Sequence, residues 1–134
     1  MNKYELIYRT IAAIIGAITG YLYGSWYPLM GILIAFVVID YGSGVLAAAY
    51  LCKLSSKVGF RGIAKKIMIF FIVAVAHLSD VAFGFNHVVM NAAIYFYLAN
   101  ELISIIENAG RMDLPVPNKV KNMVELLNGK DNAK

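Results

Sequence analysis

The sequence predicts an all-α integral membrane protein built from two transmembrane helical hairpins. Its hydrophobic fraction is 60% and its charged fraction is 15%, whereas soluble domains usually contain about 45–50% and about 25%. The twelve Lys and Arg residues lie in three short patches, and the segments between them, Thr10–Cys52 and Ile67–Gly110, are 43 and 44 residues long. A membrane-spanning helix needs about 20 apolar residues. Each segment therefore has the length for two spans and a turn.

The basic residues also predict the orientation of the chain. Lys and Arg gather on the cytoplasmic side of membrane proteins, and all three patches can share that side only if the chain crosses four times. We therefore expect both termini in the cytoplasm and a single membrane domain over residues 1–134. The patches are Lys3 with Arg9, then Lys53, Lys57, Arg61, Lys65 and Lys66, and finally Arg111, Lys119, Lys121, Lys130 and Lys134.

The first predicted hairpin has spans at about residues 10–24 and 29–51. Basic residues followed by an apolar run resemble a signal peptide, but no small-residue cleavage site follows, so we expect a retained first span. Ser25 and Pro28 suit the turn between the spans. Aromatic residues around this turn suit a membrane interface, namely Tyr21, Tyr23, Trp26 and Tyr27.

The second predicted hairpin has spans at about residues 67–85 and 88–106. A basic cytoplasmic loop, residues 53–66, should precede it, with Gly59 and Gly62 as helix breakers. The turn between the two spans carries no basic residue, as expected on the outer face. The polar end of the fourth span is expected to emerge among the inner headgroups, including Asn108.

A cytoplasmic tail, residues 111–134, should follow the last span. Pro115 and Pro117 should end that span, because neither can donate a backbone hydrogen bond. A short amphipathic helix is expected next, with Asn118 as its N-cap and Gly129 as its stop. Its apolar face follows the spacing of one helix side, with Val120, Met123, Val124 and Leu127.

Two stripes of small residues predict close helix packing. Gly16, Gly20 and Gly24 recur every four residues on the first span, and this spacing lets two helix backbones approach closely in lipid. The partner of that stripe is left open between another copy and a helix of the same chain. On the second span, Gly44 and Ala48 continue a stripe that begins at Asp40. It should pack inward.

Four ionisable residues lie inside the predicted spans: Asp40, His77, Asp80 and Glu101. A carboxylate at mid-membrane costs several kcal/mol unless it is paired or hydrated. Asp40 is therefore expected to line a wet pore, or to be a protonated group bonded to a neighbouring helix. His77 and Asp80 share a helix face and could pair or relay protons. Glu101 is expected to pair with a cation of the basic loop.

Several function classes find no support in the sequence. No nucleophile–His–acid set, phosphate-binding loop or metal-ligand spacing occurs, so we expect no enzyme activity, cofactor or metal. The net charge of +4 is explained by topology, and no nucleic-acid partner is expected. The single Cys52 excludes an intramolecular disulfide.

Several segments resemble the toxin-secretion/phage-lysis holin family. They are Asp40–Ala48, Ser55–Lys66, Asn100–Gly110 and Leu114–Pro117, and Asp80 also resembles a family position. Each piece is short, but they occur in the family's order and at family-like spacing over roughly residues 29–128. The first span resembles the family only in its general character and carries none of these motifs. The family is often drawn with three spans, so three remain an alternative to the four that the charge pattern predicts.

The resemblance implies a phage-encoded or prophage-derived, multi-pass protein of the bacterial cytoplasmic membrane. Such proteins form homo-oligomers in the lipid bilayer and open a lesion. A cell-wall hydrolase, or in some relatives a large toxin, then leaves the cytoplasm without forming a stable complex with the holin. Two other functions remain open. One is a small ion or drug transporter that uses Asp40 or Glu101, and the other is a membrane adaptor that recruits a soluble partner.

Overall fold

The computed structural model describes residues 1–25 and 27–127, and the regular elements in these residues are all helices. Within these residues four helices are long and apolar enough to cross a membrane, which confirms the predicted fold class. They are α1 (Lys3–Tyr23), α2 (Pro28–Tyr50), α3 (Ser56–Phe83) and α4 (Val88–Arg111), and a short α5 (Asn118–Leu127) follows. Trp26, Gly129, Lys130 and Lys134 lie outside the described residues.

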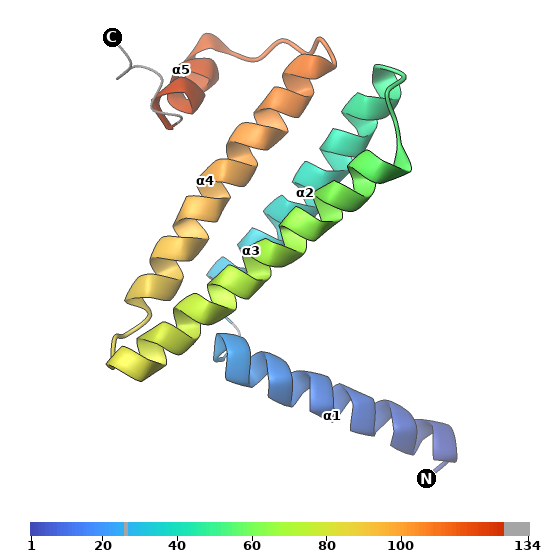
Figure 1. Ribbon diagram of the computed structural model, residues 1–134, viewed down its shortest axis with the longest axis vertical. Helices are drawn as coiled ribbons and strands as arrows, with labels where there is room; N and C mark the ends of the chain where they lie inside the picture. The colour runs from blue at the N-terminus through green and yellow to red at the C-terminus, as the bar shows by residue number, and fades with distance from the viewer. Residues whose placement is uncertain (26, 128–134) are drawn as a thin grey trace.

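Helices α2, α3 and α4 form a three-helix bundle (Figure 1). α2 and α4 run in the same direction and α3 runs opposite to both. Their contact is made by fully buried apolar side chains, including Leu33 of α2, Val73 of α3, and Met90 and Ile94 of α4. Most other large apolar side chains of the bundle point outward. This outward apolar surface suits lipid rather than water.

Helix α1 points away from the bundle instead of lying along it (Figure 1). It contacts only α3, where the Tyr23 hydroxyl donates a hydrogen bond to the Phe70 carbonyl at 2.9 Å. None of the residues of α1 is buried. The first pair of helices is thus joined by a short turn, but the two helices do not pack against each other.

The segment predicted as a basic loop is helical from Ser56 onward, so the expectation that Gly59 and Gly62 break a helix is wrong. Ser55 starts α3 by accepting a hydrogen bond from the Val58 N–H at 3.2 Å. The two glycines make room for Tyr41 of α2. A Cβ added at Gly59 would lie 3.4 Å from the Tyr41 hydroxyl, and one at Gly62 would lie 3.5 Å from its ring.

Helix α3 is longer than a bilayer requires. Its 28 residues span about 42 Å at about 1.5 Å per residue, whereas the hydrocarbon core is about 30 Å thick. The excess of about 12 Å can be taken up by tilt or can lie outside the hydrocarbon, and the basic first turns are the part of α3 expected to lie outside. α4 also continues past the predicted end at residue 106, as far as Arg111, before the two prolines interrupt the chain. On the amphipathic α5, Val124 is buried and Met123 is 61% exposed.

Candidate functional site

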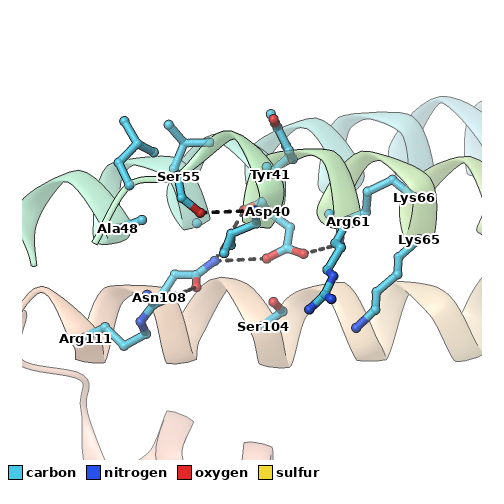
Figure 2. Close-up of a pocket in the computed structure, with 16 residues that line it drawn as sticks. Asp40, Tyr41, Ala48, Ser55, Arg61, Lys65, Lys66, Ser104, Asn108 and Arg111 are labelled. Atoms are coloured by element: carbon cyan, nitrogen blue, oxygen red, sulfur yellow. Dashed lines mark hydrogen bonds and ion pairs between the residues drawn. The ribbon is translucent and has the colours of Figure 1, made fainter. Parts of the chain in front are cut away.

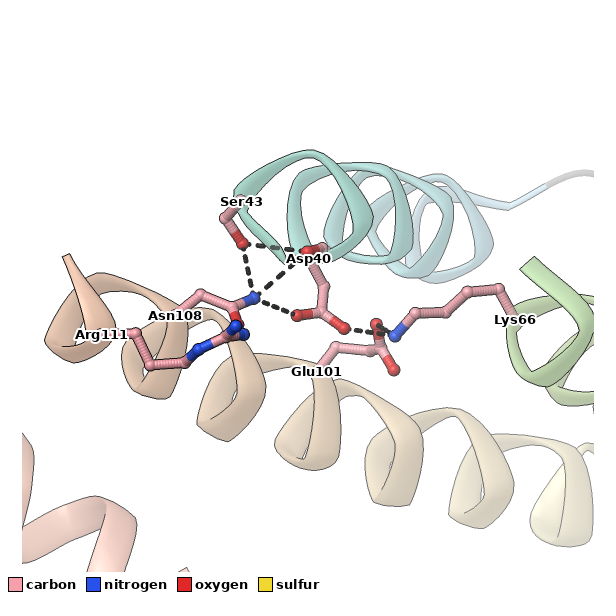
Figure 3. A network of polar contacts seen from close by, with 6 residues as sticks. All are labelled: Asp40, Ser43, Lys66, Glu101, Asn108 and Arg111. Carbon is pink, nitrogen blue, oxygen red and sulfur yellow. Dashed lines mark hydrogen bonds and ion pairs between the residues drawn. The ribbon is translucent and has the colours of Figure 1, made fainter. Parts of the chain in front are cut away.

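A buried ionic cluster ties the three helices of the bundle together (Figure 3). The Lys66 ammonium, from α3, donates hydrogen bonds to the carboxylates of Asp40 on α2 and Glu101 on α4, the latter at 2.6 Å. Asp40 and Glu101 are each only 4% exposed. The expected pairing of Glu101 with a cation of the middle basic patch is present, and Lys66 is that cation.

Asn108 joins the same cluster from the next turns of α4. Its Nδ2 donates to Asp40 Oδ1 at 3.1 Å, to the Asp40 carbonyl at 3.3 Å and to Ser43 Oγ at 2.9 Å. Arg111 donates to the Asn108 side-chain oxygen at 3.3 Å. Asn108 was expected to emerge among the headgroups; its side chain is buried against α2, and its depth in the membrane stays a prediction. The signal in the sequence was its position seven residues after Glu101, on the same helix face.

The cluster is costly to disrupt because its members are charged and buried. Each charged group loses hydration when buried, and the mutual attraction of the groups repays this loss only when their hydrogen bonds are well formed. Here one ammonium faces two carboxylates, while Asn108 and Ser43 supply further polar contacts around Asp40. Each helix of the bundle contributes at least one member, so the helices cannot separate without exposing a charge.

Asp80 and His77 do not pair with each other, so the predicted pairing is wrong. Asp80, which is 2% exposed, accepts hydrogen bonds from the backbone N–H groups of Val89 and Met90 at 2.9 and 2.8 Å. His77 faces the turn after α1, because a Cβ added at Gly24 would lie 2.9 Å from its Cε1 atom. The His77 and His87 rings stack with centroids 6.1 Å apart, and His77 Nδ1 is buried with no hydrogen-bond partner among the described residues.

The two small-residue stripes have different surroundings. Ala48 is buried, and a Cβ added at Gly44 would lie 3.5 Å from the Asn108 amide nitrogen, so the stripe on α2 packs inward against α4. On α1, a Cβ added at Gly16 or Gly20 would meet nothing within 4 Å. Gly24 alone of the α1 stripe approaches another helix.

A cleft of about 490 Å³ opens between the three bundle helices next to the cluster (Figure 2). Its lining includes Asp40 and Lys66 at one end, with Arg61, Lys65 and Arg111 around it. Lys53 and Lys57 of the middle basic patch are exposed and do not line the cleft. Within the residues that the structure describes, no three His, Cys, Asp or Glu side chains are placed to hold a metal ion.

Comparison with known proteins gives a consistent result. A model of the bacteriophage holin family matches residues 17–129. An uncharacterised protein of Listeria monocytogenes is 51% identical over 115 residues, which cover 86% of this chain and 82% of the relative. An uncharacterised protein of Halalkalibacterium halodurans is 44% identical over 130 residues, with 93% and 96% of the two chains covered.

A more distant relative is an uncharacterised 14.9 kDa protein from the nagH 3' region of Clostridium perfringens. It is 35% identical over 118 residues, which cover 87% of this chain and 89% of the relative. No solved structure matches the chain.

Proposed function

The chain belongs to the bacteriophage holin family, and on this premise we propose that it opens a lesion in the bacterial cytoplasmic membrane. Copies of the chain would accumulate and associate in the bilayer. The lesion would then let a cell-wall hydrolase or a large toxin leave the cytoplasm. The four membrane-length helices and the family membership support the coarser part of this proposal, a holin-like multi-pass membrane protein.

The observation that carries the finer part is the ionic cluster of Asp40, Lys66 and Glu101 between otherwise apolar helices. In the isolated chain these groups pair with one another beside the cleft. When several copies pack together, the same polar faces can turn toward a shared aqueous interior. A polar surface that is either paired or hydrated gives two discrete states, as a lesion that opens at a set moment requires.

Helix α1 supplies a surface for association of copies. Its apolar side chains are exposed all round, and Gly16 and Gly20 have open space above them. Small residues four apart let two membrane helices approach closely, and their packing then drives association in lipid. We assign this stripe to contact between copies, because no helix of the same chain covers it in the described residues.

Expression in a bacterial host tests the proposal directly. Inducing the chain together with a cytoplasmic cell-wall hydrolase should collapse the membrane potential and lyse the culture, and the hydrolase alone should do neither. The neutral variant Asp40→Asn/Lys66→Met/Glu101→Gln should delay the collapse, because its polar faces carry no charge to hydrate. Lys57→Met, at an exposed position of α3 that does not line the cleft, is the matched control and should leave the timing unchanged. Normal accumulation of the wild-type chain without any loss of potential would refute the proposal.

Association through α1 is tested separately. Gly16→Leu should leave the folded monomer intact, because a larger side chain meets nothing there, and should lower the yield of cross-linked oligomers several-fold. Ala17→Leu, a quarter turn away on the same helix, is the control and should have little effect. Equal oligomer yields from both variants and the wild type would remove α1 from the contact between copies.

A further inference from the structure

We propose that the cleft between α2, α3 and α4 is a binding site for the phosphate headgroup of an anionic phospholipid. This site goes beyond lesion formation, because it requires only that the bundle lies in a membrane. Its basis is the convergence of cations from two helices around one concavity that also has an apolar wall.

Three cations line this cleft without an acidic partner. Arg61 and Lys65 extend from α3 toward α4, and Arg111 comes from the end of α4 (Figure 2). In the described part of the chain, no carboxylate lies within 4 Å of any of them, whereas Lys66 is occupied by Asp40 and Glu101. Arg111 bonds only a neutral amide oxygen, that of Asn108. The cleft therefore presents uncompensated positive charge.

The arrangement of these cations on α3 is itself unfavourable without an anion. Lys57, Arg61 and Lys65 are spaced by four residues, so they stand in one row on the helix surface. Like charges at this spacing destabilise a helix by a few tenths of a kcal/mol per pair. The positive-inside rule accounts for basic residues at this end of the bundle, but it does not require them to converge on one cleft. A bound phosphate would relieve the repulsion between Arg61 and Lys65, which lie side by side in Figure 2, and would accept charge-assisted hydrogen bonds from both.

The remaining lining favours a lipid over free phosphate. Apolar side chains form part of the same cleft, namely Val45, Ala48, Leu54 and Val58. Leu54 and Val58 precede Arg61 in the chain and lie on the cytoplasmic side of the cations, so acyl chains cannot follow them. The apolar side chains on the membrane side are those of the adjoining groove between α3 and α4, which Lys65 shares with Met68, Ile72 and Tyr97. Asp40 lies between Arg111 and Arg61 in the cleft and is paired with Lys66, so an anion would bind on the side of Arg61 and Lys65 (Figure 2). A headgroup would therefore bind beside Arg61 and Lys65, with its acyl chains along the adjoining groove, and basic pockets between membrane helices are known to bind such headgroups.

Native mass spectrometry of the full chain, released from neutral detergent micelles, tests the site. The probes are phosphatidylglycerol, phosphatidylcholine with the same acyl chains, and inorganic phosphate. We expect the wild type to retain phosphatidylglycerol at least tenfold more than phosphatidylcholine. The variant Arg61→Gln/Lys65→Gln/Arg111→Gln should lose that preference, and Arg61→Gln alone should reduce it about threefold.

The control variant Lys53→Gln/Lys119→Gln/Lys121→Gln removes the same net charge from positions that do not line the cleft. It should keep the wild-type preference within twofold, and circular dichroism should show that each variant retains its helices. Equal losses in the two triple variants would overturn the proposal, because binding would then follow net charge. Displacement of phosphatidylglycerol by millimolar inorganic phosphate would also overturn it, because the site would then recognise a free anion.

Discussion

The Asp80 carboxylate accepts hydrogen bonds from the backbone N–H groups of Val89 and Met90, the second and third residues of α4. Helix N-termini leave such N–H groups without partners, and a side chain just before the helix usually accepts from them. Here the residue before α4 is His87, whose left-handed backbone makes no such bond. Asp80 therefore caps α4 from the preceding helix and fixes the α3–α4 turn.

Replacing Asp80 separates this structural role from a role in proton transfer. Asp80→Ala should lower the free energy of unfolding by about 2–3 kcal/mol, because two buried N–H groups lose a charged acceptor. Asp80→Asn keeps one acceptor oxygen and should cost about half as much. Unfolding in micelles, followed by circular dichroism during titration with a denaturing detergent, measures both. Ser79→Ala, which removes only a bond to the carbonyl of Val75 in the same helix, is the control. Equal stability of all three variants would contradict the capping role.

Lys66 compensates the charges of two buried carboxylates, so its loss should be costly. Lys66→Met should destabilise the bundle by about 3–5 kcal/mol, because Asp40 and Glu101 would remain buried without a cation. Adding Asp40→Asn and Glu101→Gln should recover most of that loss, since no charge is then left unpaired. The same detergent titration measures this recovery, with Lys57→Met as the control, because Lys57 is exposed and does not line the cleft. A triple variant no more stable than the single one would argue against the charge balance.

The candidate site could be predicted from the sequence only in part. Asp40 and Glu101 were identifiable because charged residues inside apolar runs are rare, and the pairing of Glu101 with a basic residue was expected. The choice of Lys66 among five neighbouring cations could not be predicted, since it depends on the rotation of α3 against α2. The burial of Asn108 against α2 was missed because a polar residue near a helix end suggests exposure unless the neighbouring helix is known.

At the scale of the elements, glycines form the turn that follows α1 and the turn that follows α3. Gly24 has φ = 75° and Gly84 has φ = 71°, values that favour glycine. Gly84→Ala should cost about 1–2 kcal/mol through backbone strain alone, because nothing lies near the added Cβ. Gly24→Ala should cost about 1–3 kcal/mol more, because the added Cβ would press on His77. Unfolding of the two variants under identical conditions checks the difference, and equal costs would show that the contact with His77 is negligible.

The sequence predicted which long helices form, but it did not predict where each of them begins and ends. Apolar length predicted all four long helices, and the two prolines marked the break before α5. The start of α3 was missed because Gly59 and Gly62 suggest a loop by composition, whereas the ring of Tyr41 packs over them. Such a contact between distant residues overrides local propensity. The detachment of α1 from α2 was also invisible, because hydropathy measures length and not packing.

At the scale of the whole molecule, the cations of the bundle gather at one end. The middle basic patch and Arg111 lie where α2 leads to α3 and where α4 ends, and the opposite end has none in the described residues. This asymmetry supports the proposed orientation of α2–α4. The N-terminal patch shares that side only if α1 crosses the membrane beside the bundle.

Cysteine labelling decides the number of crossings. Cys52 is exposed and is the sole cysteine of the chain, so it reports the side of the middle patch. A membrane-impermeant maleimide should reach it only from the cytoplasm. In a Cys52→Ser background, Asn2→Cys should label from the same side and Asn86→Cys from the opposite side. If Asn2→Cys and Asn86→Cys are both labelled from the side opposite to Cys52, the chain crosses three times and α1 lies outside the bilayer.

The cluster of one ammonium and two carboxylates has a consequence for how the molecule senses an energised membrane. With both carboxylates ionised it holds one excess negative charge, and carrying one charge across the bilayer involves about 2.3 kcal/mol per 100 mV. With one carboxyl protonated the cluster is neutral, and opening of the bundle is instead linked to proton concentration. Opening that moves this charge along the membrane normal would therefore depend on the voltage, and opening that changes its protonation would depend on the pH beside the cleft.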